Sequence, residues 1–276
     1  MPDGSQVAEL DLENLDSFDC AVFKGFDVLI HTAAYAHTEK VEGSGSLQKY
    51  RKVNCDATLQ LARLAINAGI KRFVFLSSIG VNGANSFRPF VEEDKVGPHD
   101  NYSLSKYEAE FGLLNIAKNV EMEVVIIRPP LVYGPGASGS FRVLMCWVGR
   151  SVPMPFGVIH NHRSFVALDN LVDFILLCAN KDKSPKAANE VFLISDGEDV
   201  STSVFLRKAS VACNVKSRLF PVPVLLMDFV ARLFGRSDIS NRLFGNLQID
   251  SSKAQTLLNW RPVITMDEQL KKSCKF

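Results

Sequence analysis

Short apolar runs alternate with segments of helical periodicity through the first half of this chain, and this alternation limits the folds open to it. The apolar runs occupy 26–31, 72–76 and 123–128, and segments with helical spacing at 46–68 and 101–117 separate them. Apolar runs of this length without polar alternation are typical of strands buried on both faces. Strands joined by helices form right-handed crossovers, so the strands lie parallel in one sheet. We therefore predict an α/β fold with helices on both faces of the sheet.

The second half of the chain has a different sequence pattern. After Gly134-Pro135-Gly136 the loops are richer in glycine and proline, and only a helix at 168–180 and a strand at 190–194 continue the earlier pattern. We expect these two elements to return to the sheet. The predicted architecture is a Rossmann-like doubly wound sheet with a smaller C-terminal substrate lobe. The sheet domain takes residues 1–131 and about 165–195, and the lobe takes 132–164 and 196–276.

The charge balance and the cysteines exclude several classes of protein. The chain has 31 basic and 30 acidic residues in 276, without the basic face that a nucleic-acid backbone needs, so we expect no nucleic-acid partner. Six scattered cysteines without metal or CxxC spacing predict reduced, buried side chains in a cytoplasmic protein. No signal peptide is evident at the start, and no His, Asp or Glu cluster has metal-ligand spacing, so we expect no metal.

The most apolar stretch of the chain lies at 220–234. Asp228 and Arg232 interrupt it, and it is shorter than the roughly 20 residues that span a bilayer. We expect no integral membrane segment. A helix packed on its own domain is the favoured interpretation, and a helix lying on a membrane surface is the alternative.

The most informative segment for chemistry contains Tyr102 and Lys106. Residues four apart on a helix project from the same side, about one turn apart. A phenol has a pKa near 10, so it is a poor base at neutral pH. A nearby ammonium favours the phenolate and lowers that pKa. The pair therefore predicts a tyrosine that removes a proton from a substrate hydroxyl while hydride leaves the same carbon.

Small and polar residues follow three of the predicted strands. Ser77 and Ser78 end the strand at 72–76, Thr32-Ala33-Ala34 follow the strand at 26–31, and Arg128-Pro129 end the strand at 123–128. Ligands of open parallel sheets bind at the carboxyl ends of strands. Because these residues would all lie at such ends, we expect a catalytic site there, with the Ser78 hydroxyl bonding the substrate oxygen.

With these motifs the chain resembles the extended short-chain dehydrogenases/reductases, the NAD-dependent epimerase/dehydratase family. The similarity runs from Asp11 to Pro262. The segments that carry it are Asp11-Leu12, 28–34, Asn54, Ser78 with Tyr102 and Lys106, 163–170 and 258–262. The segments 75–83 and 158–163 are most similar to a subgroup of UDP-glucose 4-epimerase-like proteins of polysaccharide biosynthesis.

The resemblance implies a set of site residues. Ser78, Tyr102 and Lys106 would form the catalytic triad. The implied NAD-binding residues are Asp11, Leu12, Thr32, Ala33, Ala34, Asn54, Ser77, Tyr102, Lys106, Arg128 and Pro129. The implied substrate-binding residues are Ser78, Tyr102, Leu131, Arg142 and Arg163, because an arginine fork can bind two diphosphate oxygens.

Two positions depart from the family pattern. The glycine-rich GxxGxxG loop that wraps a cofactor pyrophosphate is absent from the sequence. We therefore expect an N-terminally truncated chain that lacks the first strands of the sheet, binds NAD weakly or not at all, and tends to aggregate. Leu131 stands near the place where better-known hexose epimerases have an asparagine, which weakens the assignment of a UDP-sugar.

The leading hypothesis is NAD-dependent epimerisation at C4 of a nucleotide-activated hexose, of the UDP-glucose or UDP-N-acetylglucosamine type, through a 4-keto intermediate. Three alternatives remain open: a 4-epimerase of a lipid-linked diphospho-sugar, an NAD(P)-dependent reductase or dehydrogenase of a sugar or other ketone, and an inactive remnant. A homodimer is expected by family analogy alone. The sequence distinguishes neither the sugar nor NAD from NADP.

Overall fold

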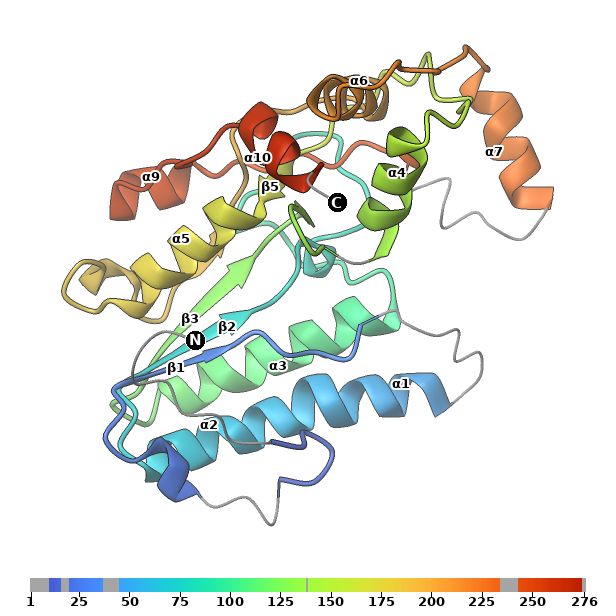
Figure 1. Ribbon diagram of the computed structural model, residues 1–276. Helices are drawn as coiled ribbons and strands as arrows, with labels where there is room; N and C mark the ends of the chain where they lie inside the picture. The colour runs from blue at the N-terminus through green and yellow to red at the C-terminus, as the bar shows by residue number, and fades with distance from the viewer. Residues whose placement is uncertain (1–9, 16–19, 37–44, 138, 234–242, 275–276) are drawn as a thin grey trace. The chain divides into compact units, whose positions relative to one another are not determined.

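The computed structural model describes residues 10–15, 20–36, 45–137, 139–233 and 243–274 (Figure 1). The chain forms two compact units. Unit 1 contains residues up to Ser77 together with Asp100–Ile126 and Cys178–Glu190, and unit 2 contains Ser78–His99, Ile127–Leu177 and the residues from Val191 onward. The division differs from the predicted boundaries, and the predicted assignment of domains to cofactor and substrate stays a prediction.

The predicted parallel sheet is confirmed. Its strands are β1 (Val28–His31), β2 (Arg72–Leu76), β3 (Glu123–Arg128) and β6 (Val191–Leu193), in the order β1-β2-β3-β6. β1 and β2 are parallel, with His31 opposite Phe75. Nearly every residue of β2 and β3 is buried, which explains why their sequences are continuous apolar runs.

The helices of unit 1 lie along one another (Figure 1). After the short η1 (Cys20–Phe23), the predicted helix at 46–68 is a continuous series of α1 (Gly45–Tyr50), a π-helical segment η2 (Arg51–Asp56) and α2 (Ala57–Asn67). α3 (Asn101–Ala117) begins where predicted because Asp100 accepts a hydrogen bond from the Ser103 amide, and the Ser103 hydroxyl accepts one from the Asp100 amide. The short η4 (Pro185–Ala187) also belongs to this unit.

Unit 2 is built around a cluster of aromatic side chains. Its further elements are η3 (Ile79–Val81), β4 (Leu131–Tyr133), α4 (Gly139–Gly149), β5 (Phe165–Ala167), α5 (Leu168–Ala179, ending in unit 1), α6 (Thr202–Ala212), α7 (Val224–Leu233), α9 (Ser252–Leu258) and α10 (Met266–Ser273). β4 and β5 pair in parallel as a second sheet. The rings of Phe165 and Phe205 stack with centroids 4.5 Å apart, and Tyr133 meets both edge-on. This cluster ties the small sheet to α6.

A half-buried carboxylate joins the small sheet to the C-terminal segment. Asp196 accepts hydrogen bonds from the Tyr133 hydroxyl (2.6 Å), the Ala167 amide (2.8 Å) and the Asn170 side chain (2.7 Å). Burial raises the pKa of Asp196, and the three hydrogen bonds oppose that rise. Asn170 in turn accepts hydrogen bonds from the backbone amides of Val263 and Ile264. The network therefore fixes the approach to α10.

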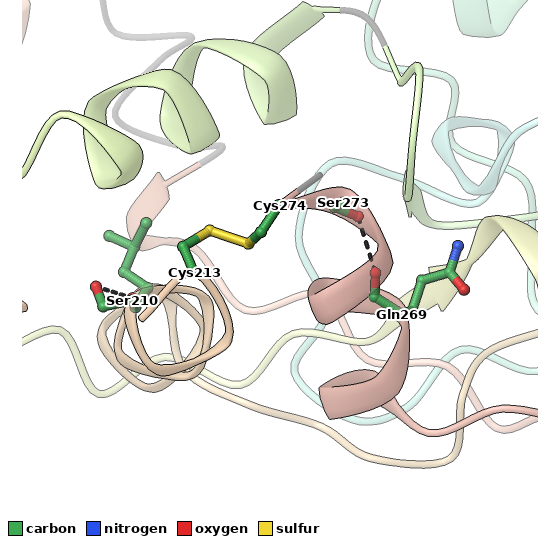
Figure 2. The surroundings of a disulfide bond; sticks show 6 residues. Ser210, Cys213, Gln269, Ser273 and Cys274 are labelled. Atoms are coloured by element: carbon green, nitrogen blue, oxygen red, sulfur yellow. Dashed lines mark hydrogen bonds between the residues drawn. A yellow bond between two sulfur atoms is a disulfide. The ribbon is translucent and has the colours of Figure 1, made fainter. Parts of the chain in front are cut away.

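The expectation that the cysteines are unpaired is wrong for Cys213 and Cys274, which form a disulfide (Figure 2). Cys213 is the C-cap residue of α6 and Cys274 is that of α10, and the two helices pack against each other. Since 61 residues separate the two cysteines in the sequence, their spacing gave no sign of a pair. Cys55, Cys146 and Cys178 are free cysteines, the first and last of them buried.

Gly157 lies where a side chain would meet backbone. A Cβ at this position would stand 2.8 Å from the carbonyl carbon of Phe220 and 2.9 Å from its oxygen. The Gly157 amide also donates a hydrogen bond to that oxygen. We expect Gly157→Ala to lower the free energy of unfolding by about 1–3 kcal/mol, measured by urea denaturation.

Gly112→Ala is the matched control, because its Cβ would meet only the side-chain carbons of Leu59 and alanine favours the helix. Equal losses of stability in the two variants would contradict the tight approach at Gly157.

Among the described residues, none of the helices has the length and apolar character needed to cross a bilayer.

Candidate active site

α3 carries the two residues on which the catalytic prediction depends. Lys106 is buried, and its Nζ donates a 2.8 Å hydrogen bond to the carbonyl oxygen of Leu76, the last residue of β2. The same nitrogen lies 4.4 Å from the centre of the Phe75 ring. The ammonium is therefore fixed at the carboxyl end of a central strand, the edge where parallel sheets bind ligands.

Burial lowers the pKa of Lys106 to about 7, and the nearby Glu110 carboxylate opposes that shift. An ammonium in a site of low polarity loses hydration, which favours the neutral amine. Near neutral pH the lysine therefore holds or releases a proton easily. This position suits a residue that alters the protonation of a neighbouring group.

The pKa of Tyr102 runs opposite to the predicted direction. Burial raises it to about 12, and the charges of Asp100 and Tyr50 add to the rise. The Tyr102 ring lies 6.4 Å from the Tyr50 ring in an edge-on arrangement. The predicted lowering depends on Lys106 together with a bound, cationic nicotinamide, whereas in the chain alone desolvation is the largest effect on the phenol. At neutral pH the phenol of this chain is protonated, so further positive charge beside it is needed before it serves as a base.

Asn54, in the π-helical segment η2, fixes the loop that follows β1 to the catalytic helix. Its Oδ1 accepts a hydrogen bond from the Tyr35 amide (2.7 Å), and its Nδ2 donates to the Tyr35 carbonyl oxygen (3.0 Å) and to the Ser105 hydroxyl (3.0 Å). Ser105 donates in turn to the backbone carbonyl oxygen of Tyr102 (2.7 Å). Both amide hydrogens of Asn54 are thus used within unit 1, and its contact with a cofactor stays a prediction.

The carboxyl ends of β1 and β2 offer a place for a flat polar ring. Thr32 and Ala33 are exposed and Ala34 is half-buried directly after β1. Directly after β2, the buried hydroxyl of Ser77 has no hydrogen-bond partner among the described residues. A buried hydroxyl without a partner is costly, so a bound group with a hydrogen-bonding atom would stabilise this site. These residues fit the nicotinamide end of a dinucleotide.

His31 packs in the core and contacts Thr58 and Phe75, so its side chain is not placed to act as a base. Its Nε2 lies 3.0 Å from the Thr58 hydroxyl, and its ring stacks on Phe75. Burial lowers the pKa of His31 to about 4, helped by the charge of Lys106. It is therefore a neutral residue of the core.

Asp11 and Leu12, predicted at the adenine, lie in a turn of unit 1. Asp11 is exposed, and its carboxylate accepts a hydrogen bond from the Glu13 amide (2.8 Å). Leu12 is half-buried. Their contact with an adenine stays a prediction.

Three predicted site residues of unit 2 surround η3. Ser78 caps it, and its hydroxyl accepts a hydrogen bond from the Gly80 amide (3.1 Å). The Pro129 carbonyl oxygen accepts one from the Ile79 amide (3.0 Å). Arg128 is buried, with Nη1 donating to the Asn82 side chain (2.9 Å). Arg128 and Pro129 therefore hold the segment that carries Ser78.

The remaining predicted substrate residues lie on different elements of unit 2. Leu131 is exposed at the start of β4, and Arg142 is exposed on α4. Arg163 is half-buried, and its Nη1 donates to the Gly245 carbonyl oxygen (2.9 Å). Their contact with a substrate stays a prediction. Within the described ranges, no group of three His, Cys, Asp or Glu side chains could hold a metal ion.

A buried lysine one helical turn from a tyrosine, fixed at the end of a parallel strand, defines a short-chain dehydrogenase/reductase. More specifically, the chain belongs to the NAD dependent epimerase/dehydratase family, whose model matches residues 2–194. It is 45% identical over 255 residues to a UDP-glucose 4-epimerase of Vibrio cholerae, an alignment that covers 91% of this chain and 77% of that protein.

More distant relatives agree with this family. An N-acetyl-alpha-D-glucosaminyl-diphospho-ditrans,octacis-undecaprenol 4-epimerase of Escherichia coli O157:H7 is 26% identical over 85% of this chain and 70% of its own length. The crystal structure of a UDP-glucuronic acid 4-epimerase from Bacillus cereus in complex with NAD matches 96% of this chain and 76% of its own, with a TM-score of 0.73 at 21% identity. The fold prediction and the family resemblance are thus confirmed.

The burial of Lys106 has a consequence for stability. The pKa of this lysine is about 7 in the folded chain and about 10.4 in an unfolded one, so the unfolded state binds more protons between these values. The stability of the wild type should therefore rise with pH across this window. In Lys106→Met we expect the free energy of unfolding to rise less steeply with pH. The difference in slope between the two proteins should be up to about 1.4 kcal/mol per pH unit.

The measurement is urea unfolding of both proteins near pH 7 and near pH 10. Every other titrating group is shared, so the difference between the two slopes isolates Lys106. The variant also leaves the Leu76 carbonyl oxygen without the lysine donor, which lowers its stability at both pH values. Identical slopes would show that the ammonium is not buried in the folded chain.

Proposed function

We propose that this chain catalyses NAD-dependent epimerisation at C4 of a UDP-activated hexose of the UDP-glucose or UDP-N-acetylglucosamine type. The observation that carries the proposal is the fixed position of Lys106 at the carboxyl end of β2, one turn from Tyr102. The 45% identity to a UDP-glucose 4-epimerase over most of the chain supports the sugar class.

The chain's residues have distinct roles in this proposal. The Tyr102 Oη takes the proton of the C4 hydroxyl and later returns it. Lys106 favours the phenolate, and the Ser78 hydroxyl bonds the same substrate oxygen. NAD, when bound, supplies the acceptor and later the donor of the C4 hydride. The 4-keto sugar turns over between the two proton transfers, so the product has the opposite configuration at C4.

Cofactor and substrate are assigned to different sets of residues. We assign the binding of NAD to Thr32, Ala33, Ala34, Asn54, Ser77, Tyr102, Lys106, Arg128 and Pro129, with its adenine at Asp11 and Leu12. The exposure of Thr32 and Ala33 after β1 supports this assignment, as does the Ser77 hydroxyl, which has no hydrogen-bond partner among the described residues. We assign the sugar and diphosphate to Leu131, Arg142 and Arg163, since an arginine fork can bind two phosphate oxygens. We also assign this activity to a homodimer, by family analogy alone. The disulfide between Cys213 and Cys274 removes the reduced cysteines as an argument for a cytoplasmic location.

Calorimetry of the purified chain with NAD comes first, because the absence of the glycine-rich loop predicts weak cofactor binding. The direct test is then the conversion of UDP-glucose to UDP-galactose by the same chain at a saturating NAD concentration, followed by proton NMR. The same assay with UDP-N-acetylglucosamine distinguishes the two sugars. An epimerase produces the C4 epimer with no net change in NADH absorbance. Net formation or consumption of NADH without an epimer would contradict epimerisation and support the reductase or dehydrogenase alternative.

A second candidate is epimerisation of a lipid-linked diphospho-sugar. Helix α7 favours it, because large apolar side chains of this helix are exposed. The 26% identity to an undecaprenol-diphosphate sugar epimerase supports it further. The test is the same NMR assay with undecaprenyl-diphospho-N-acetylglucosamine in detergent, beside UDP-N-acetylglucosamine. Conversion of the lipid-linked sugar alone would favour this candidate over the first.

A further inference from the structure

Helix α7 of unit 2 carries apolar side chains on two sides. On one side Val224 and Met227 pack against the core of unit 2. On the other side Leu225, Phe229 and Leu233 are 85%, 64% and 72% exposed. Residues four apart share one side of a helix, so these three form a continuous outer stripe. The expected packing of this helix on its own domain is therefore correct for its inner side only.

Two further apolar side chains near this outer stripe are also exposed to solvent. Leu226, adjacent to Leu225, is 54% exposed. Phe220, shortly before the helix, is 45% exposed. Large apolar side chains gathered on one element are unusual on a free surface and mark a site of contact.

Positively charged residues lie close to the apolar stripe in the sequence. Lys216 and Arg218 are exposed in the segment that leads to α7, and neither forms an ion pair within the described part of the chain. On the helix, Arg232 pairs with Asp228 (2.8 Å), which cancels their charges. The residues 214–233 thus carry three basic groups and one acidic group, a net +2, whereas the whole chain carries only +1.

We propose that the outer side of α7, with Lys216 and Arg218, lies on the surface of an anionic lipid bilayer. Exposed leucine and phenylalanine enter the boundary between headgroups and acyl chains, and basic residues bind the lipid phosphates. α7 has 10 residues and so reaches about 15 Å, too short to cross a bilayer. This inference goes beyond the proposed function and does not depend on which sugar the site binds.

A second copy of the chain fits this surface less well. In a twofold contact, the same patch meets itself, so the basic groups of both copies would be brought together. Anionic lipid matches both the apolar stripe and its charge.

The experiment is flotation of the full 276-residue chain with vesicles. One vesicle type contains phosphatidylcholine alone, and the other contains phosphatidylcholine with phosphatidylglycerol. The wild type should float with the anionic vesicles and weakly or not at all with the neutral ones, and added salt should weaken binding. L225S/F229S and K216E/R218E should each lower the partition coefficient at least tenfold.

Leu176→Ser is the matched control, because Leu176 is 59% exposed on another helix, α5. Its flotation and its thermal unfolding should equal those of the wild type. L225S/F229S should also keep the wild-type unfolding temperature, since both side chains are exposed.

Three outcomes would overturn the proposal. The first is absence of flotation with anionic vesicles. The second is a dimer that L225S/F229S converts to a monomer without any binding to vesicles, which would assign the surface to a second copy. The third is a lower unfolding temperature of L225S/F229S without vesicle binding, which would indicate that another segment of the chain covers the stripe.

Discussion

Tyr102→Phe is expected to lower the turnover number of the epimerase reaction by about 10³-fold or more, while the fold is unchanged. The substitution removes one oxygen, and with it the group that takes and returns the substrate proton. General acid–base catalysis by one side chain contributes about 10²–10⁴-fold. The Tyr102 ring still packs near Tyr50 in the variant, so circular dichroism and thermal unfolding should match the wild type.

Tyr107→Phe is the matched control on the same helix. Tyr107 lies five residues further along α3, and its ring faces Phe111 at 6.5 Å. We expect its variant to keep the wild-type rate. A Tyr102→Phe enzyme that retains its rate, or a Tyr107→Phe enzyme that loses as much, would contradict the assigned proton transfer.

Breaking the disulfide between Cys213 and Cys274 is expected to lower the free energy of unfolding by about 4 kcal/mol. The bond closes a loop of 61 residues, and loss of chain entropy in the unfolded state gives this magnitude. Cys274→Ser should show the loss under oxidising conditions, measured by guanidinium unfolding. Added dithiothreitol should bring the wild type to the same value.

Cys146→Ser provides the control for this experiment, because Cys146 is a free cysteine of unit 2. Its unfolding should remain sensitive to dithiothreitol, whereas that of Cys274→Ser should not. If the wild type has the same stability with and without the reductant, the bond does not form in solution.

The central elements of the fold could be predicted from the sequence because each has a strong local signal. The strands at 72–76 and 123–128 are uninterrupted apolar runs, and both occur with the predicted bounds. The helix at 101–117 also has its predicted bounds, and its capping box lies in the sequence as Asp100 and Ser103. Local chemistry alone determines where such elements begin and end.

The sequence could not reveal contacts between distant segments. Arg72 begins a strand and is fully buried, where it pairs with Glu123 and donates to the Ser184 hydroxyl. The disulfide is a similar case. The π-helical turn at Arg51–Asp56 interrupts what reads as one regular helix. Each depends on partners that only the folded chain brings together.

In the candidate site, too, the local features could be predicted from the sequence and the features that depend on the fold could not. The identity of Tyr102 and Lys106 followed from their spacing, but the direction of the tyrosine pKa did not. Desolvation depends on how much of the phenol the fold covers, and the sequence contains no measure of that. The role of Ser105 was also missed, since a serine on a helix has no distinctive pattern until its partner Asn54 is located.

The carboxamide of residue 54 sets the mutual placement of two pieces of chain that are far apart in the sequence, the loop at Tyr35 and the backbone of Ser105. A change in the position of either segment would break the hydrogen bonds that the same side chain makes to both, so the two segments are expected to change together. Sequence changes that alter substrate choice should therefore occur mainly in unit 2. A new loop grafted after β1 should be transferred together with Asn54 and Ser105.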